Sequence, residues 1–328
     1  MAFIQVSGIG KYGEEQNPVL QDISFSMKRL QRIAIAGETG SGKSTLLKII
    51  AGLIQPDTGE VRFEDQPVEG PAERLVPGHP GIAYLSQHFE LPKFLRVEQV
   101  LTYANTLGEE EATAIYEVCQ ITHLLKRKTD QLSGGERQRI AFARLLITSP
   151  RLLLLDEPFS NLDMVHKNIL KAVIEDIHDR LGITCMLISH DPLDILPWAD
   201  TIFLMKDGKI VQKGAPAKVY TSPVNEYAAG LLGKYTLLVP AKAQILVKLL
   251  RLKPGKKNLF IRPENIKIVK KGKHNLSGRI QTIYYFGSYS EAVVLVNDVL
   301  LLIRTDANNL SAGDMLYLSL AADTVRYI

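Results

Sequence analysis

Cysteine is scarce in this sequence: Cys119 and Cys185 are its two cysteines, and they lie far apart along 328 residues. Disulfide frameworks and cysteine-rich zinc sites need several cysteines at short spacings, so neither is expected. This cysteine usage predicts a reducing, cytoplasmic environment.

Long apolar segments and a strong net charge are also missing. No run of about 18 apolar residues occurs, so no transmembrane helix is predicted, and residues 1–6 indicate a strand rather than a signal peptide. The formal net charge of +4 is too small to indicate nucleic acid or an anionic membrane as a partner. If the protein serves a membrane process, it must therefore act through a separate membrane subunit.

Short apolar strands that alternate with helices fill the first two thirds of the chain. Strands are predicted at 32–36, 152–155 and 184–188, and a mainly helical stretch at about 95–150. Near-continuous apolar strands between helices favour a parallel sheet covered on both faces. The fold class predicted for this part is therefore α/β.

The last part of the chain has a different pattern. Prolines, a glycine and several lysines indicate a linker at 236–258, and short alternating strands follow it. These strands are predicted at 259–262, 266–269, 279–284, 292–296, 299–304 and 315–320. The predicted organisation is an α/β domain at 1–235, with a helical subdomain at about 88–150, then the linker and a small β-barrel or sandwich at 259–328.

A glycine-rich loop fits the pattern G-x-x-x-x-G-K-[ST]. Its residues are Gly37, Glu38, Thr39, Gly40, Ser41, Gly42, Lys43, Ser44 and Thr45. In this pattern the glycines let backbone N–H groups face phosphates, and the helix that follows adds its positive end. Lys43 is expected to reach the β- and γ-phosphates of ATP, and the Ser44 hydroxyl to bind Mg²⁺. A plain helix-capping turn would also use glycines, but the preceding strand and the following helix favour a phosphate site.

Two carboxylates, Asp156 and Glu157, follow the strand at 152–155. The C-terminal ends of parallel strands face the ligand. Asp156 is therefore expected to hold Mg²⁺, and Glu157 to act as general base on the attacking water. A solvated pair entering a loop would explain the two residues taken alone, whereas the phosphate loop upstream favours catalysis.

A second anion site is predicted at Ser133, Gly134, Gly135 and Glu136. Ser133 and Glu136 have the spacing of a capping box, which is the purely structural explanation. The two glycines are unnecessary for a cap, and they leave the N–H groups of a helix end exposed. Because one phosphate loop already holds one nucleotide, this motif is predicted to serve ATP held by another copy of the chain.

Together these motifs resemble those of the ATP-binding cassette (ABC) ATPases over residues 1–235. The loop resembles Walker A, Leu132–Glu136 the signature motif, and Leu152–Glu157 Walker B. Gln87 resembles the Q-loop glutamine, Ser160–Asp163 the D-loop, His190 the switch histidine, and Tyr12 the aromatic residue that stacks on adenine. Gln87, His190 and Tyr12 could each be an ordinary loop or strand-end residue, but the order and separation of the motifs favour the resemblance.

The resemblance implies a P-loop NTPase fold with a helical subdomain, with ATP and Mg²⁺ bound. It implies catalytic roles for Glu157, His190 and Gln87, metal contacts for Ser44, Gln87 and Asp156, and nucleotide contacts for Tyr12, the loop, Ser133–Glu136 and Asp163. It also implies a homodimer that closes on two ATP molecules. Glu136 stands where the signature usually has Gln, and Arg137 beside it is expected to offset the extra charge.

The β domain at 259–328 resembles the TOBE domain, an OB-like domain of importer ATPases for sugars, oxyanions, metal ions or polyamines. Phe260–Glu264 and the strands after it carry this resemblance. Lysines at 253–257 and 270–273 could form a nucleic-acid surface on such a fold. No aromatic residue interleaves with them, so they are interpreted as solvated loops and no nucleic acid is expected.

The predicted function is the ATP-hydrolysing subunit of an importer, held at the inner face of the cell membrane by permease subunits. Leu91–Leu95 is apolar and is expected in the groove that receives the permease, although packing inside the helical subdomain would explain it nearly as well. One alternative is a cassette ATPase acting on the ribosome or on nucleic acid, and another is a β-domain binding module with an inactive cassette. A lone cassette without a long coiled coil disfavours the first, and the intact catalytic residues disfavour the second.

Overall fold

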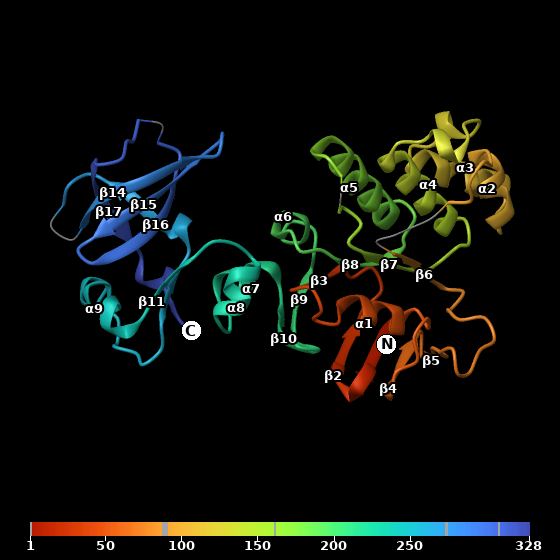
Figure 1. The fold of residues 1–328 in the computed structure, drawn as a ribbon, viewed down its shortest axis with the longest axis horizontal. Helices are drawn as coiled ribbons and strands as arrows, with labels where there is room; N and C mark the ends of the chain where they lie inside the picture. Colours follow the sequence, from red (N-terminus) through yellow and green to blue (C-terminus); the bar gives the residue numbers. More distant parts are fainter. Residues whose placement is uncertain (1, 87–90, 161, 273–274, 308) are drawn as a thin grey trace. The chain divides into compact units, whose positions relative to one another are not determined.

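The computed structural model describes residues 2–86, 91–160, 162–272, 275–307 and 309–328, and it divides the chain into two compact units (Figure 1). The first unit is Met1–Pro216 and the second is Ala217–Ile328. None of the helices in the described part of the chain combines the length and hydrophobicity needed to span a bilayer.

The first unit contains two β-sheets. Strands of the antiparallel sheet, in the order β2-β1-β4-β5, are β1 (Ile4–Tyr12), β2 (Pro18–Met27), β4 (Thr58–Phe63) and β5 (Gln66–Pro67). Strands of the second sheet, in the order β10-β9-β3-β8-β7-β6, are β3 (Ile33–Gly37), β6 (Ile82–Leu85), β7 (Leu152–Asp156), β8 (Thr184–Ile188), β9 (Thr201–Lys206) and β10 (Lys209–Gly214). In the second sheet the strands from β9 to β6 are parallel, as their near-continuous apolar sequences predict.

Helices lie on both sides of the second sheet (Figure 1). They are α1 (Lys43–Ile50), α2 (Val97–Ala104), α3 (Glu109–Val118), α4 (Gly134–Leu146), α5 (Met164–Asp179) and α6 (Pro192–Ile195), with 3₁₀ turns at Glu14–Gln16, Thr122–Leu124 and Thr129–Gln131. Figure 1 shows α1 on the side of the antiparallel sheet and α2–α5 on the opposite side. This arrangement confirms the predicted α/β fold with a helical part.

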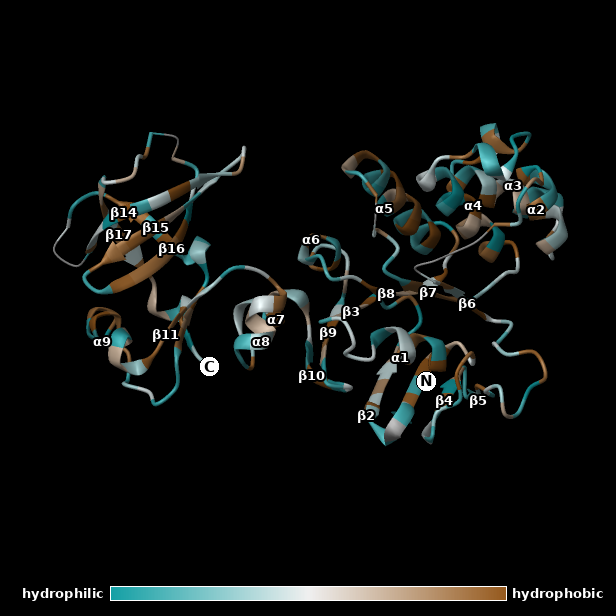
Figure 2. Cartoon of the chain, viewed as in Figure 1, coloured by the Kyte–Doolittle hydropathy of each residue, from teal (hydrophilic) through white to brown (hydrophobic). Residues whose placement is uncertain are grey.

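The core of the first unit lies between its two sheets. Side chains from β1, β2, α1, β3, β7 and β8 make up one continuous buried cluster, which includes Ile4, Leu46, Ile35 and Leu154. The α5 helix is amphipathic: Leu170, Val173, Ile174 and Ile177 are buried at helical spacing, and Figure 2 shows hydrophilic residues on its other face. The burial of these apolar faces fixes the loops at the strand ends.

The second unit contains an antiparallel β domain and the segment that leads into it. Its elements are α7 (Pro216–Thr221), which starts at the boundary, α8 (Glu226–Leu231), β11 (Thr236–Leu238), α9 (Pro240–Leu249), β12 (Leu259–Ile261), β13 (Ile266–Val269), β14 (Leu276–Tyr285), β15 (Ser290–Val296), β16 (Val299–Thr305), β17 (Met315–Leu320) and β18 (Arg326–Tyr327), with 3₁₀ turns at Pro263–Asn265 and Ala322–Thr324. The sheets are β11-β12-β18 and β13-β17-β14-β15-β16. Asn297 adopts a positive φ of 51° in the turn between β15 and β16.

The structure differs from the sequence prediction at the junction of the two parts. The division falls after Pro216, earlier than the predicted boundary after residue 235. The predicted linker at 236–258 contains β11 and α9, and Leu238, Ala243 and Leu246 belong to the apolar core of the β domain. The prolines and lysines of this stretch suggested a linker, but its apolar residues are buried by strands that are distant in sequence.

Arg262 holds the start of the second unit against β12. The side chain is 1% exposed, and its guanidinium donates to the carbonyl oxygens of Tyr220 at 3.1 Å, Gly233 at 2.9 Å and Lys234 at 3.0 Å. It also lies 4.0 Å from the centroid of the Tyr220 ring. These partners lie in the segment that the sequence had assigned to the first domain.

Replacement of Arg262 by Met is expected to destabilise the second unit by about 3 kcal/mol, because several buried carbonyl groups lose their donor. Hydrogen exchange of residues 217–262 at increasing urea concentration measures this loss. Arg279→Met on the exposed face of β14 is the matched control. Equal protection in the two variants would contradict the anchoring role of Arg262.

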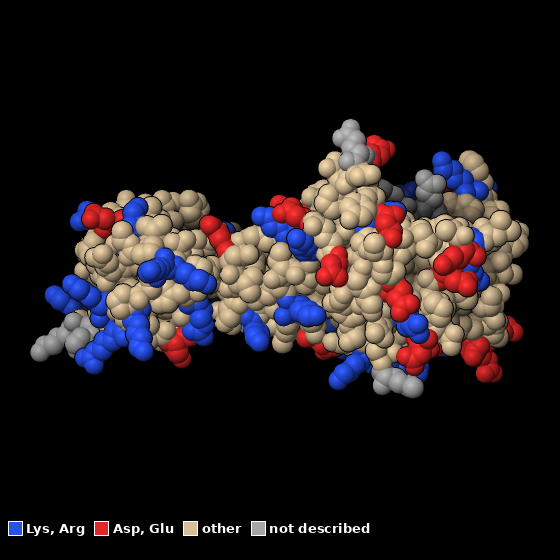
Figure 3. Space-filling view, turned by 90° about the horizontal axis from the view of Figure 1, so that it is seen from below, with Lys and Arg blue, Asp and Glu red and all other residues tan. Residues whose placement is uncertain are grey.

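Charged side chains of both signs alternate on the first unit in the face shown in Figure 3, whereas Lys and Arg outnumber Asp and Glu on the second unit there. Lys271 Nζ lies 6.0 Å from the ring centroid of Tyr317 on β17. An aromatic residue therefore does accompany one of the lysines at 270–273. Sequence spacing could not reveal it, because the ring comes from a different strand.

Candidate functional site

The phosphate loop joins the end of β3 to the start of α1. Close packing requires two of its glycines: a Cβ on Gly37 would lie 2.4 Å from the Met205 carbonyl oxygen, and one on Gly42 would lie 2.6 Å from that of Val19. Gly42 also has a φ of 93°, which other residues rarely adopt. The backbone therefore turns tightly into α1, and Glu38, Thr39 and Gly40 form its exposed tip.

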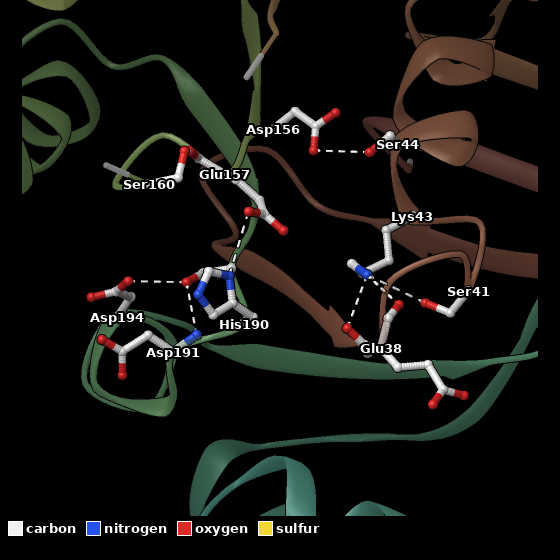
Figure 4. A network of polar contacts seen from close by, with 12 residues as sticks. Glu38, Ser41, Lys43, Ser44, Asp156, Glu157, Ser160, His190, Asp191 and Asp194 are labelled. Carbon is white, nitrogen blue, oxygen red and sulfur yellow. Dashed lines mark hydrogen bonds and ion pairs between the residues drawn. The ribbon is translucent and has the colours of Figure 1, made fainter. Parts of the chain in front are cut away.

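Lys43 lies beneath this loop and is 7% exposed. Its ammonium donates to the carbonyl oxygens of Gly37 at 2.9 Å and Glu38 at 2.7 Å, and to Ser41 Oγ at 3.4 Å (Figure 4). Burial lowers the pKa of Lys43, and the charges of Glu157, Asp156 and Glu38 oppose that change. A cation held inside a turn of backbone amides is suited to bind phosphate.

Asp156, at the end of β7, lies opposite the phosphate loop. The Ser44 hydroxyl donates to Asp156 Oδ1 at 3.0 Å (Figure 4), and the Tyr84 hydroxyl on β6 donates to Oδ2 at 2.8 Å. Burial and this hydrogen bond raise the pKa of Tyr84, so the phenol stays a donor. No sequence pattern indicated a role for Tyr84, because the contact depends on the pairing of β6 with β7.

The oxygen atoms of Ser44 and Asp156 fit a magnesium ion. Mg²⁺ prefers oxygen ligands and commonly takes one or two from the protein and the others from phosphates and water. Among the described residues, no group of three or more His, Cys, Asp or Glu side chains could hold a metal. The two oxygen atoms of Ser44 and Asp156 match the number that Mg²⁺ commonly takes from a protein when phosphates supply the other ligands.

Tyr84→Phe is expected to raise the Mg²⁺ concentration for half-maximal ATP hydrolysis about tenfold, because Asp156 loses the donor that orients it. The measurement is a magnesium titration of the ATPase rate. Tyr103→Phe, at a tyrosine that is 74% exposed on α2, is the control. Identical magnesium curves for the two variants would exclude an orienting role for Tyr84.

Glu157 and His190 meet beside this site. His190 Nδ1 lies 3.4 Å from Glu157 Oε2 (Figure 4), and the exposed fractions of the two side chains are 69% and 23%. Glu157 has a positive φ of 50°, and its backbone is fixed by its N–H bond to the Ile188 carbonyl oxygen at 3.1 Å. Strained backbone of this kind persists where the surrounding structure holds it, often at functional sites.

The signature motif caps α4 as the sequence predicted. The Ser133 N–H donates to Glu136 Oε2 at 2.8 Å, and the Glu136 N–H donates to Ser133 Oγ at 3.2 Å, so the capping box is confirmed. The cation paired with Glu136 is Arg127, whose Nη1 lies 3.3 Å from Glu136 Oε1, and the offsetting role of Arg137 stays a prediction. The Ser133 N–H bond, assisted by the charge of Arg127, lowers the pKa of Glu136.

The other predicted site residues lie on separate elements. Tyr12 ends β1, is 51% exposed, and its N–H donates to Asp57. Asp163 accepts from the His166 N–H at 3.0 Å and caps α5. Gln87 lies outside the described residues. The structure thus brings Walker A, Asp156, Glu157 and His190 together. The signature motif lies elsewhere: it is at the start of α4, and Figure 1 shows α4 and α1 on opposite sides of the sheet.

Two family models match the chain. The model described as ABC transporter matches residues 20–160, and the model described as TOBE domain matches residues 259–328. The second range coincides with the strands that the sequence assigned to a β domain.

Curated relatives include ATP-binding proteins of import systems. The chain is 34% identical to the glucose import ATP-binding protein GlcV of Saccharolobus solfataricus, over 82% of this chain and 81% of that one. It is 33% identical to the sulfate/thiosulfate import ATP-binding protein CysA of Synechococcus elongatus, over 90% and 86%. The spermidine/putrescine import ATP-binding protein PotA of Clostridium acetobutylicum is 28% identical over 96% and 93%.

Solved structures with a similar fold include parts of ABC transporters. CbiO1 of Clostridium perfringens, part of the ABC transporter complex cbiONQ, has a TM-score of 0.60 and 27% identity over 66% of this chain and 90% of that one. MJ1267, an ATP-binding cassette of an ABC transporter, has a TM-score of 0.59 and 26% identity over 71% and 100% in its ADP conformation. The predicted P-loop fold is confirmed by these similarities.

Proposed function

We propose, since this chain belongs to the ABC transporters as an ATP-binding import subunit, that two copies of it close on ATP to drive uptake of a small solute through separate permease subunits. The candidate solutes are sugars, oxyanions, metal ions and polyamines. The chain itself is an ATPase, as import subunits of this family are.

The observation that carries this proposal is that three groups lie together: a lysine suited to bind phosphate, a pair of oxygen atoms suited to bind a metal ion, and a carboxylate suited to act as a base. Lys43 would exchange its carbonyl partners for the phosphates of ATP, which are charged and stronger acceptors. Glu157 would accept a proton from the attacking water. His190, whose Nδ1 lies 3.4 Å from Glu157 Oε2, would contact the γ-phosphate. Magnesium, held by Ser44 and Asp156 when bound, would neutralise developing phosphate charge.

The signature motif supports a shared site between two copies. Ser133 and Glu136 cap α4 with each other, and the exposed Gly134 has no neighbour within 4 Å of the Cβ that it lacks. The start of α4 therefore presents free space and backbone N–H groups to an anion. Because this helix end belongs to a different side of the sheet from the phosphate loop, we assign it to ATP bound by the second copy.

A groove in the first unit is the proposed binding site for a segment of the permease. It has a volume of about 550 Å³ and is lined by residues of the loop at 74–80, by β6 and by α4, among them Leu53, Tyr84 and Leu145. Leu75 and Val76, in the same loop, are 100% and 75% exposed, and Phe94 in the apolar segment Leu91–Leu95 is 73% exposed. Exposed apolar side chains of this kind indicate a protein partner, and they favour docking over internal packing for Phe94.

The test of this function combines hydrolysis with assembly. The purified full chain should hydrolyse ATP with Mg²⁺, and it should co-purify with co-expressed permease subunits and stimulate ATP-dependent uptake in vesicles. This assembly would hold the chain peripherally at the cytoplasmic face of the membrane. Hydrolysis without permease binding, together with co-sedimentation with ribosomes, would instead establish the non-transport alternative.

A further inference from the structure

Two consecutive side chains at the start of α5 face different neighbours, although neither belongs to a motif that the function uses. His166 contacts the signature end of α4, and Lys167 contacts the loop that carries His190. We propose that His166 and Lys167 are positioning residues that tie the signature motif of one chain to its own switch histidine. This inference rests on the proposed function, because it concerns two motifs that contact ATP there.

The first contact explains why residue 135 is glycine. A Cβ built on Gly135 would lie 2.7 Å from His166 Cδ2, 3.2 Å from Cγ and 3.3 Å from Cβ. The ring itself is held, because His166 Nδ1 lies 2.6 Å from Asp163 Oδ2 while the His166 N–H donates to the other oxygen of the same carboxylate. The space beside Gly135 is therefore filled by this chain's own histidine, and any larger residue must displace the ring.

The second contact fixes the loop around His190. Lys167 Nζ lies 2.6 Å from Asp191 Oδ2 and 2.7 Å from Asp194 Oδ1, and Lys171 adds an ion pair to Asp194 at 2.9 Å. Asp194 is 3% exposed and its other oxygen accepts from Ser189 Oγ at 2.9 Å. Figure 4 shows Asp191 and Asp194 beside His190.

Ser189 completes the connection to the histidine. Its hydroxyl also accepts from the Asp191 N–H at 3.1 Å, so both residues that flank His190 are held by the network that Lys167 enters. His190 in turn lies 3.4 Å from Glu157. A shift of α5 would therefore move the signature glycine on one side and the histidine on the other.

The arrangement of α5 makes this coupling possible. Neighbouring residues on a helix point about 100° apart, so consecutive side chains can contact two different elements. Asp163 fixes the start of the same helix. In the closed dimer, the signature would contact the partner's ATP and His190 the chain's own ATP. The first turn of α5 would then link the two ATP sites within one polypeptide.

The Lys167 contact is tested by steady-state kinetics of the full chain. Lys167→Met is expected to lower kcat about tenfold, since a small displacement of a catalytic group is costly, and to change the Kd for ATP less than about twofold. Lys167→Arg, which keeps both ion pairs, should restore kcat to within about threefold. Lys213→Met, at an exposed lysine on β10, is the control. Fluorescence of the single tryptophan, Trp198, checks that the region after α6 is folded.

A normal kcat in Lys167→Met overturns the proposal, and so does a loss of ATP binding equal to the loss of kcat, because that pattern indicates a general structural defect. Failure of Lys167→Arg to restore kcat also overturns it.

The His166 contact is tested by a double-mutant cycle with Gly135. Gly135→Ala is expected to lower kcat at least tenfold when His166 is present, and less than about threefold in a His166→Ala background, where the space is free. His166→Ala keeps the cap of α5, because the donor to Asp163 Oδ1 is the backbone N–H. An equal cost of Gly135→Ala in both backgrounds overturns the proposal.

Failure of the proposed function would give a different experimental result. If the wild-type chain hydrolyses no ATP, the function is wrong, but the same Gly135–His166 cycle can be read in the midpoint of thermal unfolding. Additive effects on that midpoint would overturn the contact as well, whereas coupled effects would support it.

Discussion

Glu157→Gln is expected to lower ATP hydrolysis by roughly 10²-fold or more, which is the usual contribution of a positioned general base. The substitution keeps the shape of the side chain and removes its charge and basicity. ATP should still bind, because Lys43, Ser44 and Asp156 are unchanged. The closed dimer should even be favoured, since a carboxylate no longer repels the γ-phosphate. Size-exclusion chromatography with ATP and Mg²⁺, alongside phosphate release, measures both effects.

Glu175→Gln on the exposed face of α5 is the matched control for this substitution, and it should hydrolyse ATP at the wild-type rate. A Glu157→Gln variant that hydrolyses normally rules out Glu157 as the base. An inactive variant that stays monomeric at high ATP leaves the base in place and contradicts the shared-site dimer. Glu136 in the signature would then be the first residue to exchange for Gln.

Lys43→Ala is expected to abolish ATP hydrolysis, with a loss of about 10²-fold or more, because the loop loses the positive charge that faces the phosphates. The fold should persist. The ammonium bonds carbonyl groups of the loop itself, at 2.7–2.9 Å, and not groups of the apolar core. Equilibrium dialysis with ATP, phosphate release and circular dichroism together separate binding, catalysis and folding.

Lys48→Ala, in the last turn of the same helix, removes a lysine of α1 that is absent from the phosphate loop and serves as the control. Wild-type hydrolysis in Lys43→Ala would contradict the assignment of the loop. Loss of the circular dichroism signal of folded secondary structure would show instead that the turn from β3 into α1 requires the buried ammonium.

Elements built from local patterns were predictable from the sequence. The apolar strand 184–188 coincides with β8, and the strands predicted at 266–269 and 315–320 coincide with β13 and β17. The capping box of Ser133 and Glu136 also follows from spacing alone, because both partners lie within one turn of one helix. Walker A was recognisable for the same reason: its glycines, lysine and hydroxyl residues are consecutive in the chain.

The partners of these motifs required the tertiary structure. Tyr84 reaches Asp156 because β6 pairs with β7, Arg127 pairs with Glu136, and His166 fills the space beside Gly135. The stretch predicted as a linker is buried against strands that come later in the chain.

The physical reason is the range of the forces involved. Backbone periodicity and helix capping depend on residues a few positions apart, so the sequence alone determined strands such as β8, β13 and β17, the capped start of α4 and the phosphate loop. Burial, ion pairing and close packing depend on which elements the fold brings together. For that reason only the tertiary structure decided which side chains contact Asp156, Glu136 and Gly135, and which ones hold the loop around His190.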